Sequence, residues 1–470
     1  MSSLSMLQSS VQSRVQSRSM GMKLIVVCGL ALLLTLPALF VKGLIEERTE
    51  RAVDVIREVS AHVGGQQTFL GPILAVPYSI PLQSEADPRK HGIYLISPGR
   101  ASAVVKTTTE ERRRSLFKVP VFQADLRLDA GFDLTGVAAV IPQGAQLDWS
   151  RAEVLVGVSD ARGALADAIV TVDGTKLTLV PAETAQDLPI GGGQSQPIKL
   201  TLFGANVAGV AKPNAQFNVT SALRFSGAQR VAVLAYGKTT HLAAQGDWPS
   251  PGFDGGFLPV SRTVSSHGFS AEWTVPFIAR GVRAEGPVDA MTGLDATALG
   301  VSFIEVADPY QSVNRSLKYI VLFLGLVFLT HFVFEVTTGR RVHPAQYILV
   351  GIAQIIFYLL LLSLAERIGF DYGFLIAGAA TVILLASNAG WIFSSRLQAV
   401  RALAIFGLLY SLIYLLLRLE DNALLVGAFA SFLTVAAVMY FTRKIDWYSS
   451  RPATGAPEQQ TPPLGQGDAA

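Results

Sequence analysis

The chain has 470 residues, of which 50% are hydrophobic and only 16% are charged. This composition is too apolar for an ordinary soluble enzyme and indicates a membrane protein. The net charge of +3 is small and spread along the sequence, which argues against nucleic-acid binding, and the single Cys28 excludes an intrachain disulfide and a cysteine metal site.

The first part of the chain predicts a tail followed by a membrane anchor. Residues 1–22 are rich in Ser and Gln, so we expect a disordered cytoplasmic tail. Residues 23–42 are apolar over a length that can cross a bilayer as a helix. The sequence after Pro37 is a poor cleavage site, which favours a retained anchor over a removed signal peptide. The arginines before it and Lys23 predict a cytoplasmic N-terminus.

A change of periodicity separates the next two segments. Residues 44–64 predict an amphipathic juxtamembrane helix, because apolar residues recur at helical spacing among charges. From 65 to 307 apolar and polar residues alternate instead, most clearly in 122–132, 217–225 and 269–277. Strands with one solvated face give this pattern. We therefore expect a β-rich domain, antiparallel and sandwich-like, inserted after the first helix.

One strand of this domain carries a particular expectation. The run 71–78 is apolar and is interrupted by Pro72 and Pro77. Proline donates no hydrogen bond to a β ladder, so the run predicts an edge strand or the first strand.

Five further apolar segments follow residue 308, and each can cross a bilayer, the fourth only with its flanks. They are 317–336, 347–365, 372–393, 402–417 and 423–441. Alternate loops between them carry basic residues, and the other loops carry more acid than base. The positive-inside rule then predicts six helices, a five-helix bundle at 308–445, both termini in the cytoplasm and residues 65–307 in a periplasm. Residues 446–470 predict a second disordered cytoplasmic tail.

A long helix is expected from Asp308 to Glu335, with Asp308 as N-cap and Pro309 at the first helical position. At about 1.5 Å per residue it spans about 40 Å, more than a bilayer core of about 30 Å requires. It is therefore expected to begin in water and to join the β-rich domain to the bundle. Candidates for an interfacial or coupling role at its outer end are Asp308, Tyr310, Arg315 and Lys318.

Two ionisable residues, His331 and Glu335, lie four apart on one face of that helix. Ionisable groups at membrane depth are costly and commonly functional, so they form a candidate intramembrane polar pair. Snorkelling or a structural pair with Arg340 is the alternative. Gln346 and Gln354 share a face of the next helix and can hydrogen-bond across the bundle.

Aromatic residues in the β-rich domain are candidates for a partner-binding rim. They are Trp248, Phe253 and Trp273, the first two beside a turn with two prolines. A purely structural turn is the alternative. Sequence motifs of metalloproteases, α/β-hydrolases and paired metal ligands do not occur, so no catalytic residue, metal or cofactor is predicted.

Several motifs in this order resemble the CreD family of bacterial inner membrane proteins. They are GGQQT at 64–68, GPILAVPY at 71–78, DWPSP at 247–251, FLP at 257–259, FSAEW at 269–273, DPYQ at 308–311, HPAQY at 343–347 and FYLLLLS at 357–363. One departure is His62-Val63, where a Trp is expected before the glycine. The resemblance implies an envelope-integrity protein linked to the Cre two-component system, and it implies no reaction.

We therefore expect a non-enzymatic role in envelope maintenance during stress. The expected partners are membrane lipids or other envelope proteins and no nucleic acid, and the oligomeric state is not indicated. The first alternative is a transporter or lipid-handling protein, with the bundle as path and the β-rich domain holding cargo. A path requires polar residues of several helices to meet inside the bundle. A membrane-embedded enzyme, the least favoured alternative, requires a cleft with converging titratable groups.

Overall fold

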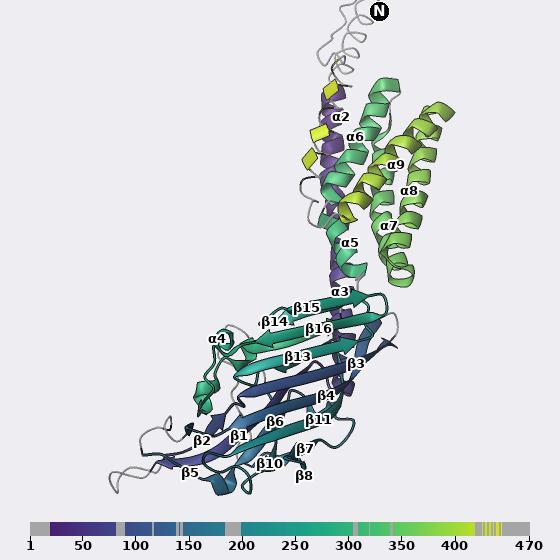
Figure 1. Ribbon diagram of the computed structural model, residues 1–470. Coiled ribbons are helices and arrows are strands. Elements are labelled where there is room, and N and C mark those ends of the chain that lie inside the picture. The colour runs from purple at the N-terminus through teal and green to yellow at the C-terminus, as the bar shows by residue number, and fades with distance from the viewer. Residues whose placement is uncertain are drawn as a thin grey trace, which may run out of the picture. The chain divides into compact units, whose positions relative to one another are not determined.

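The computed structural model describes residues 19–80, 90–114, 117–137, 141, 144–183, 199–303, 309–318, 320–338 and 342–418, with scattered residues from 425 to 443. The chain divides into two compact units (Figure 1). One is helical and comprises Met1–Arg48 and Ala307–Ala470, and the other is β-rich and comprises Thr49–Val306.

The helical unit is a bundle of long apolar helices. Its helices are α2 (Ser19–Leu33), the first part of α3 (Thr35–Val63), α5 (Pro309–Lys318), α6 (Ile320–Thr338), α7 (Pro344–Ile368), α8 (Phe370–Phe393) and α9 (Arg396–Arg418). Among the described residues, four helices are long and apolar enough to cross a membrane, namely Ile25–Val63, α7, α8 and α9, and a shorter apolar helix covers Phe323–Glu335. Most of the sixth expected helix, 423–441, lies outside the described residues.

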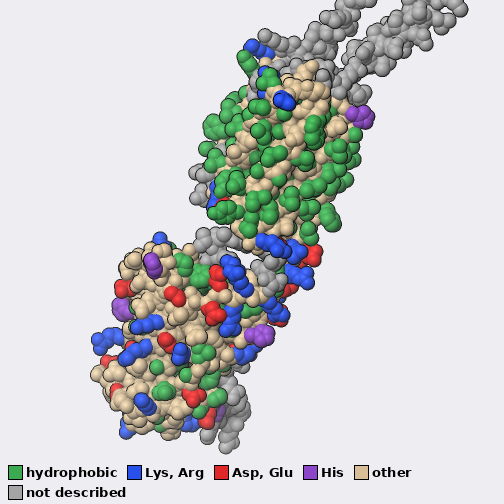
Figure 2. Space-filling model, turned by 90° about the vertical axis from the view of Figure 1, so that its right-hand side faces the viewer, with side chains coloured by type: hydrophobic (Ala, Val, Ile, Leu, Met, Phe, Trp, Pro, Cys, Tyr) green, Lys and Arg blue, Asp and Glu red, His purple; other side chains and the backbone are tan. Residues whose placement is uncertain are grey.

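The outer surface of this bundle is apolar. Large side chains on α7, α8 and α9 are exposed, among them Leu349, Ile356, Leu375, Ile383 and Leu408. Figure 2 shows such side chains covering the visible face of the helical unit, whereas the visible face of the β-rich unit carries many charges. Helices that are apolar on the outside as well as the inside are typical of a membrane bundle.

The anchor and the juxtamembrane helix form an almost continuous rod instead of two separate helices. The only interruption is a turn at Leu34, between α2 and α3. Pro37 explains this turn, because it has no N–H to donate to the carbonyl of residue 33. No second break follows residue 42, since α3 continues to Val63. The expected helix from Asp308 is present as α5 and α6, and Asp308 and Tyr319 lie outside the described residues.

The β-rich unit consists of two sheets. The ten-stranded sheet contains β1 (Gln67–Ile80), β2 (Lys90–Ile96), β5 (Gln146–Leu147), β6 (Glu153–Val158), β9 (Val180–Pro181), β10 (Thr201–Asn206), β12 (Arg230–Leu234), β14 (Pro251–Gly255), β17 (Glu285–Pro287) and β18 (Ala298–Phe303). The eight-stranded sheet has the order β15 (Ser261–Ser265), β16 (Gly268–Val275), β13 (Thr239–Gly246), β3 (Arg100–Arg114), β4 (Phe117–Asp133), β11 (Gln216–Ala228), β7 (Ile169–Val172) and β8 (Thr175–Thr178).

The two sheets share one hydrophobic core, as expected for a sandwich. Tyr236, which follows β12, reaches across this core. Its hydroxyl donates to the carbonyl oxygens of Ser102 in β3 and Asp129 in β4, at 2.9 and 2.8 Å. A Cβ on Gly71 of β1 would lie 2.4 Å from the Tyr236 ring, so only glycine fits beneath it. The ring of Phe69 in β1 also contacts the ring of Phe225 in β11 of the other sheet, with centroids 5.3 Å apart.

The three alternating segments are confirmed as strands β4, β11 and β16, and all three belong to the eight-stranded sheet. The expectation of antiparallel pairing needs a correction. Most pairs are antiparallel, but β1 pairs with β12 and β3 pairs with β13 in parallel. Alternation reports only which face of a strand is solvated and is the same for both pairing directions, so the sequence pattern could not reveal these pairs.

The expectation for the run 71–78 is confirmed in one alternative and wrong in the other, because the run belongs to the first strand but not to an edge strand. It forms part of β1, which lies inside the ten-stranded sheet and pairs with β12, β2, β5 and β6. Pro72 is tolerated because the register between β1 and β6 shifts between Leu70 and Ile73. A proline at such an irregularity removes no ladder hydrogen bond.

Candidate functional site

The interior of the helical unit contains polar side chains, and the first is Glu335 near the end of α6. Its buried carboxylate accepts hydrogen bonds from the backbone N–H of Val342 at 3.0 Å and from the hydroxyl of Tyr347 at 2.9 Å. Tyr347 is buried in the first turn of α7. A buried carboxylate requires donors of this kind. Glu335 therefore ties the end of α6 to the start of α7.

His331 lies one turn before Glu335 and is also buried. Its ring stacks on Phe406 of α9, with centroids 5.2 Å apart and an interplanar angle of 27°. Its Nδ1 faces the carbonyl oxygen of Val327 at 3.3 Å, whereas Nε2 is buried and has no hydrogen-bond partner among the described residues. If Nδ1 carries the proton, Nε2 is an unsatisfied acceptor.

A second polar group combines three helices: Gln354 of α7, Thr381 of α8 and Tyr410 of α9. All three side chains are buried. Gln354 and Thr381 adjoin the Tyr410 hydroxyl. Even so, the Gln354 amide and this hydroxyl make no hydrogen bond of normal geometry with any described residue. Sequence reasoning missed Thr381 and Tyr410, because Thr and Tyr are unremarkable in an apolar helix.

These polar residues follow one another along the inside of the bundle. On α6 the order is Glu335, then His331, and the facing residues on α9 are Phe406 and, one turn on, Tyr410. Gln354 lies two turns beyond Tyr347 on the buried face of α7. We call Glu335, His331, Gln354, Thr381 and Tyr410 the polar row. Buried polar atoms without protein partners are sites where ordered water, a proton or a small polar solute binds.

The other predicted residues of the helical unit are less informative. Asp308 lies outside the described residues, as do the side chains of Tyr310 and Lys318. Arg315 is half-buried, and its Nη2 donates to Ser312 Oγ at 3.2 Å. The proposed interfacial role of these residues stays a prediction.

The predicted aromatic rim of the β-rich unit needs a correction at Trp273. This side chain is fully buried, and its indole N–H donates to the carbonyl oxygen of Phe257 at 3.1 Å. It belongs to the core because it points to the inner face of β16. Trp248 and Phe253 are half-buried, and the Phe253 ring lies 5.9 Å from that of Trp273. Only these two can contribute to a rim.

Four large apolar side chains are exposed on the segments that flank the C-terminal half of β16. Leu258 and Val260, which precede β15, are 71% and 77% exposed, and Phe277 and Ile278 of α4 (Phe277–Arg280) are 51% and 92% exposed. Helix α4 follows β16 at the end of the sheet where β15 begins (Figure 1). We call these four residues the apolar corner.

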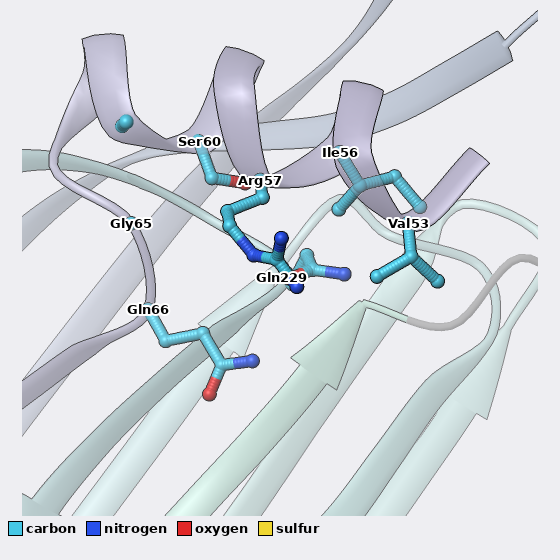
Figure 3. A pocket seen from close by; sticks show the side chains of 8 residues that line it. Val53, Ile56, Arg57, Ser60, Gly65, Gln66 and Gln229 are labelled. Carbon is cyan, nitrogen blue, oxygen red and sulfur yellow. The ribbon is translucent and has the colours of Figure 1, made fainter. Parts of the chain in front are cut away.

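A pocket of about 380 Å³ lies between the C-terminal half of α3 and the sheets (Figure 3). It is lined by Val53, Ile56, Arg57, Ser60, Ala61, Gly65, Gln66 and Gln229. Arg57 already pairs with Asp54 at 2.9 Å. The pocket has no converging titratable groups, and no cluster of metal-ligating side chains occurs among the described residues.

The apolar bundle with its polar interior, joined in one chain to a large β-rich unit, defines an integral membrane protein. The family model for inner membrane protein CreD matches residues 19–448. Inner membrane protein CreD of Escherichia coli (strain K12) is 31% identical over 432 residues, which cover 90% of this chain and 92% of the E. coli protein. The chain therefore belongs to the CreD family of inner membrane proteins.

Proposed function

We propose that this protein maintains the integrity of the cell envelope in a stress response linked to the Cre two-component system, and that it acts by contact and not by catalysis. In this proposal the β-rich unit faces the periplasm and both termini face the cytoplasm. Its partners are membrane lipids or other envelope proteins. Family membership supports the location in the inner membrane, and the charge pattern of the loops supports the sidedness.

The apolar corner carries the proposal of a contact role. Large apolar side chains that gather at the surface of a folded unit are typical of an interaction site. Ile278 is almost fully exposed, although the core of the same unit buries many other aliphatic and aromatic side chains. The half-buried Phe253 packs against Phe269 and Trp273 of β16 and can extend this surface, whereas Trp248 lies beside the start of β16, at the opposite end from α4.

In-cell crosslinking tests this role. A photo-crosslinking amino acid at Val260 or Ile278 is expected to capture lipid or protein. The matched control is Ile169 of β7, which is also exposed but lies near the opposite edge of the eight-stranded sheet. Equal capture from all three positions would contradict a specific contact surface.

Cysteine labelling tests the sidedness. In a chain whose Cys28 is replaced by Ala, a membrane-impermeant maleimide added to spheroplasts is expected to label Thr175→Cys at the exposed start of β8. It is expected to leave Arg396→Cys, at the exposed start of α9, unlabelled until the membrane is permeabilised. The reverse pattern would place the β-rich unit in the cytoplasm and remove the periplasmic contact role.

The polar row favours a second candidate function, the passage of a proton or a small polar solute through the bundle. Polar residues from four helices are buried along the inside of the bundle, and His331, Gln354 and Tyr410 have polar atoms without a hydrogen-bond partner among the described residues. His331→Phe is then expected to abolish resistance to envelope stress in cells, whereas Phe332→Leu, at a buried neighbouring position, is expected to preserve it. A contact role alone predicts that both variants keep their function.

A further inference from the structure

A buried cation without a described counter-charge lies at the end of α4, the helical turn that also carries Phe277 and Ile278 of the apolar corner. Arg280, the last residue of α4, is only 3% exposed. Its Nη2 donates to Ser97 Oγ at 3.0 Å and lies 3.9 Å from the sulfur of Met291. Its Nε and Nη1 are buried and have no hydrogen-bond partner among the described residues.

Burying a guanidinium without a counter-charge costs free energy. A guanidinium has five N–H donors and stays charged, and a buried charge is normally paired with a carboxylate or another anion. Burial lowers the pKa of Arg280 to about 10, and no described carboxylate contributes an opposing effect. Glu285 lies nearby in sequence but acts on Tyr94, where burial and this carboxylate raise the tyrosine pKa to about 12. The chain therefore provides no anion for Arg280 among its described residues.

The surroundings of Arg280 resemble a site rather than a surface. Ser97, its hydrogen-bond partner, is buried at the end of β2, and the Ser97 backbone N–H donates to the carbonyl oxygen of Ala284 at 2.7 Å. Arg280 ends a single helical turn between Pro276 and Gly281, and Gly281 has a φ of +70° that favours glycine.

We propose that Arg280 binds a phosphate-type anion, and that the ligand is the head group of an anionic lipid. Guanidinium is well suited to phosphate, because its N–H groups match two phosphate oxygens at once. Phe277 and Ile278, on the same helical turn, are exposed and can contact an acyl chain. This site rests on the proposed contact function and gives the chemistry of the ligand. A lipid is favoured over a free phosphate ion because the ion would bind the same guanidinium but would make no contact with the two apolar side chains.

Thermal unfolding of the full chain in a maltoside detergent tests this inference, with tryptophan fluorescence as the readout of unfolding. The probes are inorganic phosphate, short-chain phosphatidylglycerol, short-chain phosphatidylcholine, and sodium chloride at matched ionic strength. Phosphatidylglycerol is expected to raise the melting temperature most, because it combines the anion with a chain. Arg280→Met is expected to weaken its apparent affinity by more than about tenfold, the effect of losing a charge-assisted hydrogen bond.

Two controls separate the outcomes. Arg283→Met, at an exposed position three residues on, is expected to keep the full shift. If Arg280→Met does not fold, Ile278→Ser, at an exposed position, is expected to weaken the response to phosphatidylglycerol and to spare the response to phosphate. A shift with phosphate equal to that with the lipid would assign the site to the free ion and overturn the lipid.

Absence of any shift beyond sodium chloride, or an equal shift in Arg280→Met, would overturn the site and leave internal water as the partner of Arg280. These results are independent of the crosslinking experiment. Capture at Val260 or Ile278 without a lipid-induced shift would retain the contact function with another kind of partner. A shift without capture in cells would retain the site and reject the proposed contact function.

Discussion

Two glutamines show how differently the two units treat buried polar groups. Gln67 in the β-rich unit and Gln354 in the helical unit both have side chains that are 0% exposed. The Gln67 amide donates to the carbonyl oxygens of Gly64, Asp160 and Ser226 at 2.8, 3.0 and 3.3 Å. Gln354 has no hydrogen-bond partner of normal geometry at either amide atom.

Gln67 has a structural role that Gln354 lacks. Gln67 joins the end of α3, the loop after β6 and the end of β11, so its hydrogen bonds hold three chain segments together. The same applies to Tyr236, whose hydroxyl serves two carbonyls of the opposite sheet. A fully buried amide without partners does not stabilise a fold, because its desolvation is uncompensated. Gln354 adjoins the Tyr410 hydroxyl but makes no hydrogen bond of normal geometry with a described residue, so it is expected to stabilise its unit less than Gln67 does.

The largest expected effect follows replacement of the satisfied glutamine. Gln67→Leu would remove the buried amide that these carbonyls share as a donor and is expected to destabilise the β-rich unit by about 3 kcal/mol. Thermal unfolding of the purified chain would show this loss. The exposed neighbour provides the control, since Gln66→Leu is expected to stay within about 0.5 kcal/mol of the original chain. An equally small effect at both positions would remove the contrast between the two units.

The unsatisfied glutamine is expected to respond in the opposite direction. Gln354→Leu removes an uncompensated amide from an apolar interior and is expected to leave stability unchanged or to raise it by about 1 kcal/mol. Thermal unfolding in detergent measures this change, and envelope resistance in cells measures function. Higher stability combined with lost resistance would assign the polar row to a path. A loss of several degrees in melting temperature would instead show that Gln354 has a partner that holds the bundle together.

The sequence was most informative where one face of a strand is solvated and the other is buried. Strands β4, β11 and β16 each have one wet face, so alternation located them. Strands β1 and β6 of the ten-stranded sheet are buried along most or all of their length, so they show no alternation to read. Pairing direction was hidden for a related reason, because it depends on partners more than 100 residues away in β12 and β13.

The candidate sites follow the same logic. His331 and Gln354 were identifiable because ionisable and amide groups stand out in an apolar helix. Tyr410 was not, because a tyrosine in such a helix carries no signal until its hydroxyl is known to be buried. Arg280 was not identifiable either, since arginine in a polar stretch is normally exposed and only the fold shows its burial.

The smallest expected effect concerns a carboxylate beside Gln67, and it depends on pH. Asp160 accepts hydrogen bonds from the side chain of Arg162 at 2.6 Å and from the Arg162 backbone N–H at 3.0 Å. The side-chain hydrogen bond to Arg162 is the main cause that lowers the pKa of Asp160. A carboxylate whose pKa is lower in the folded state stabilises the fold above its unfolded pKa of about 3.9 and loses that contribution as pH falls through the folded value.

Asp160→Asn is therefore expected to cost about 0.5 kcal/mol at neutral pH, since Arg162 is exposed and solvent screens the pair, while Asn can still cap the following turn. The difference in unfolding free energy between the two chains should begin to shrink below about pH 4, as Asp160 is protonated in the unfolded state, and should close as pH falls through the lower folded pKa. Unfolding midpoints measured from pH 7 to pH 3 test this. Arg162→Met should reproduce most of the neutral-pH loss, because it removes the main cause of the shift. If the difference in unfolding free energy does not change with pH, the charge of Asp160 does not contribute to stability. Asp160 then acts only as a hydrogen-bond acceptor for Arg162.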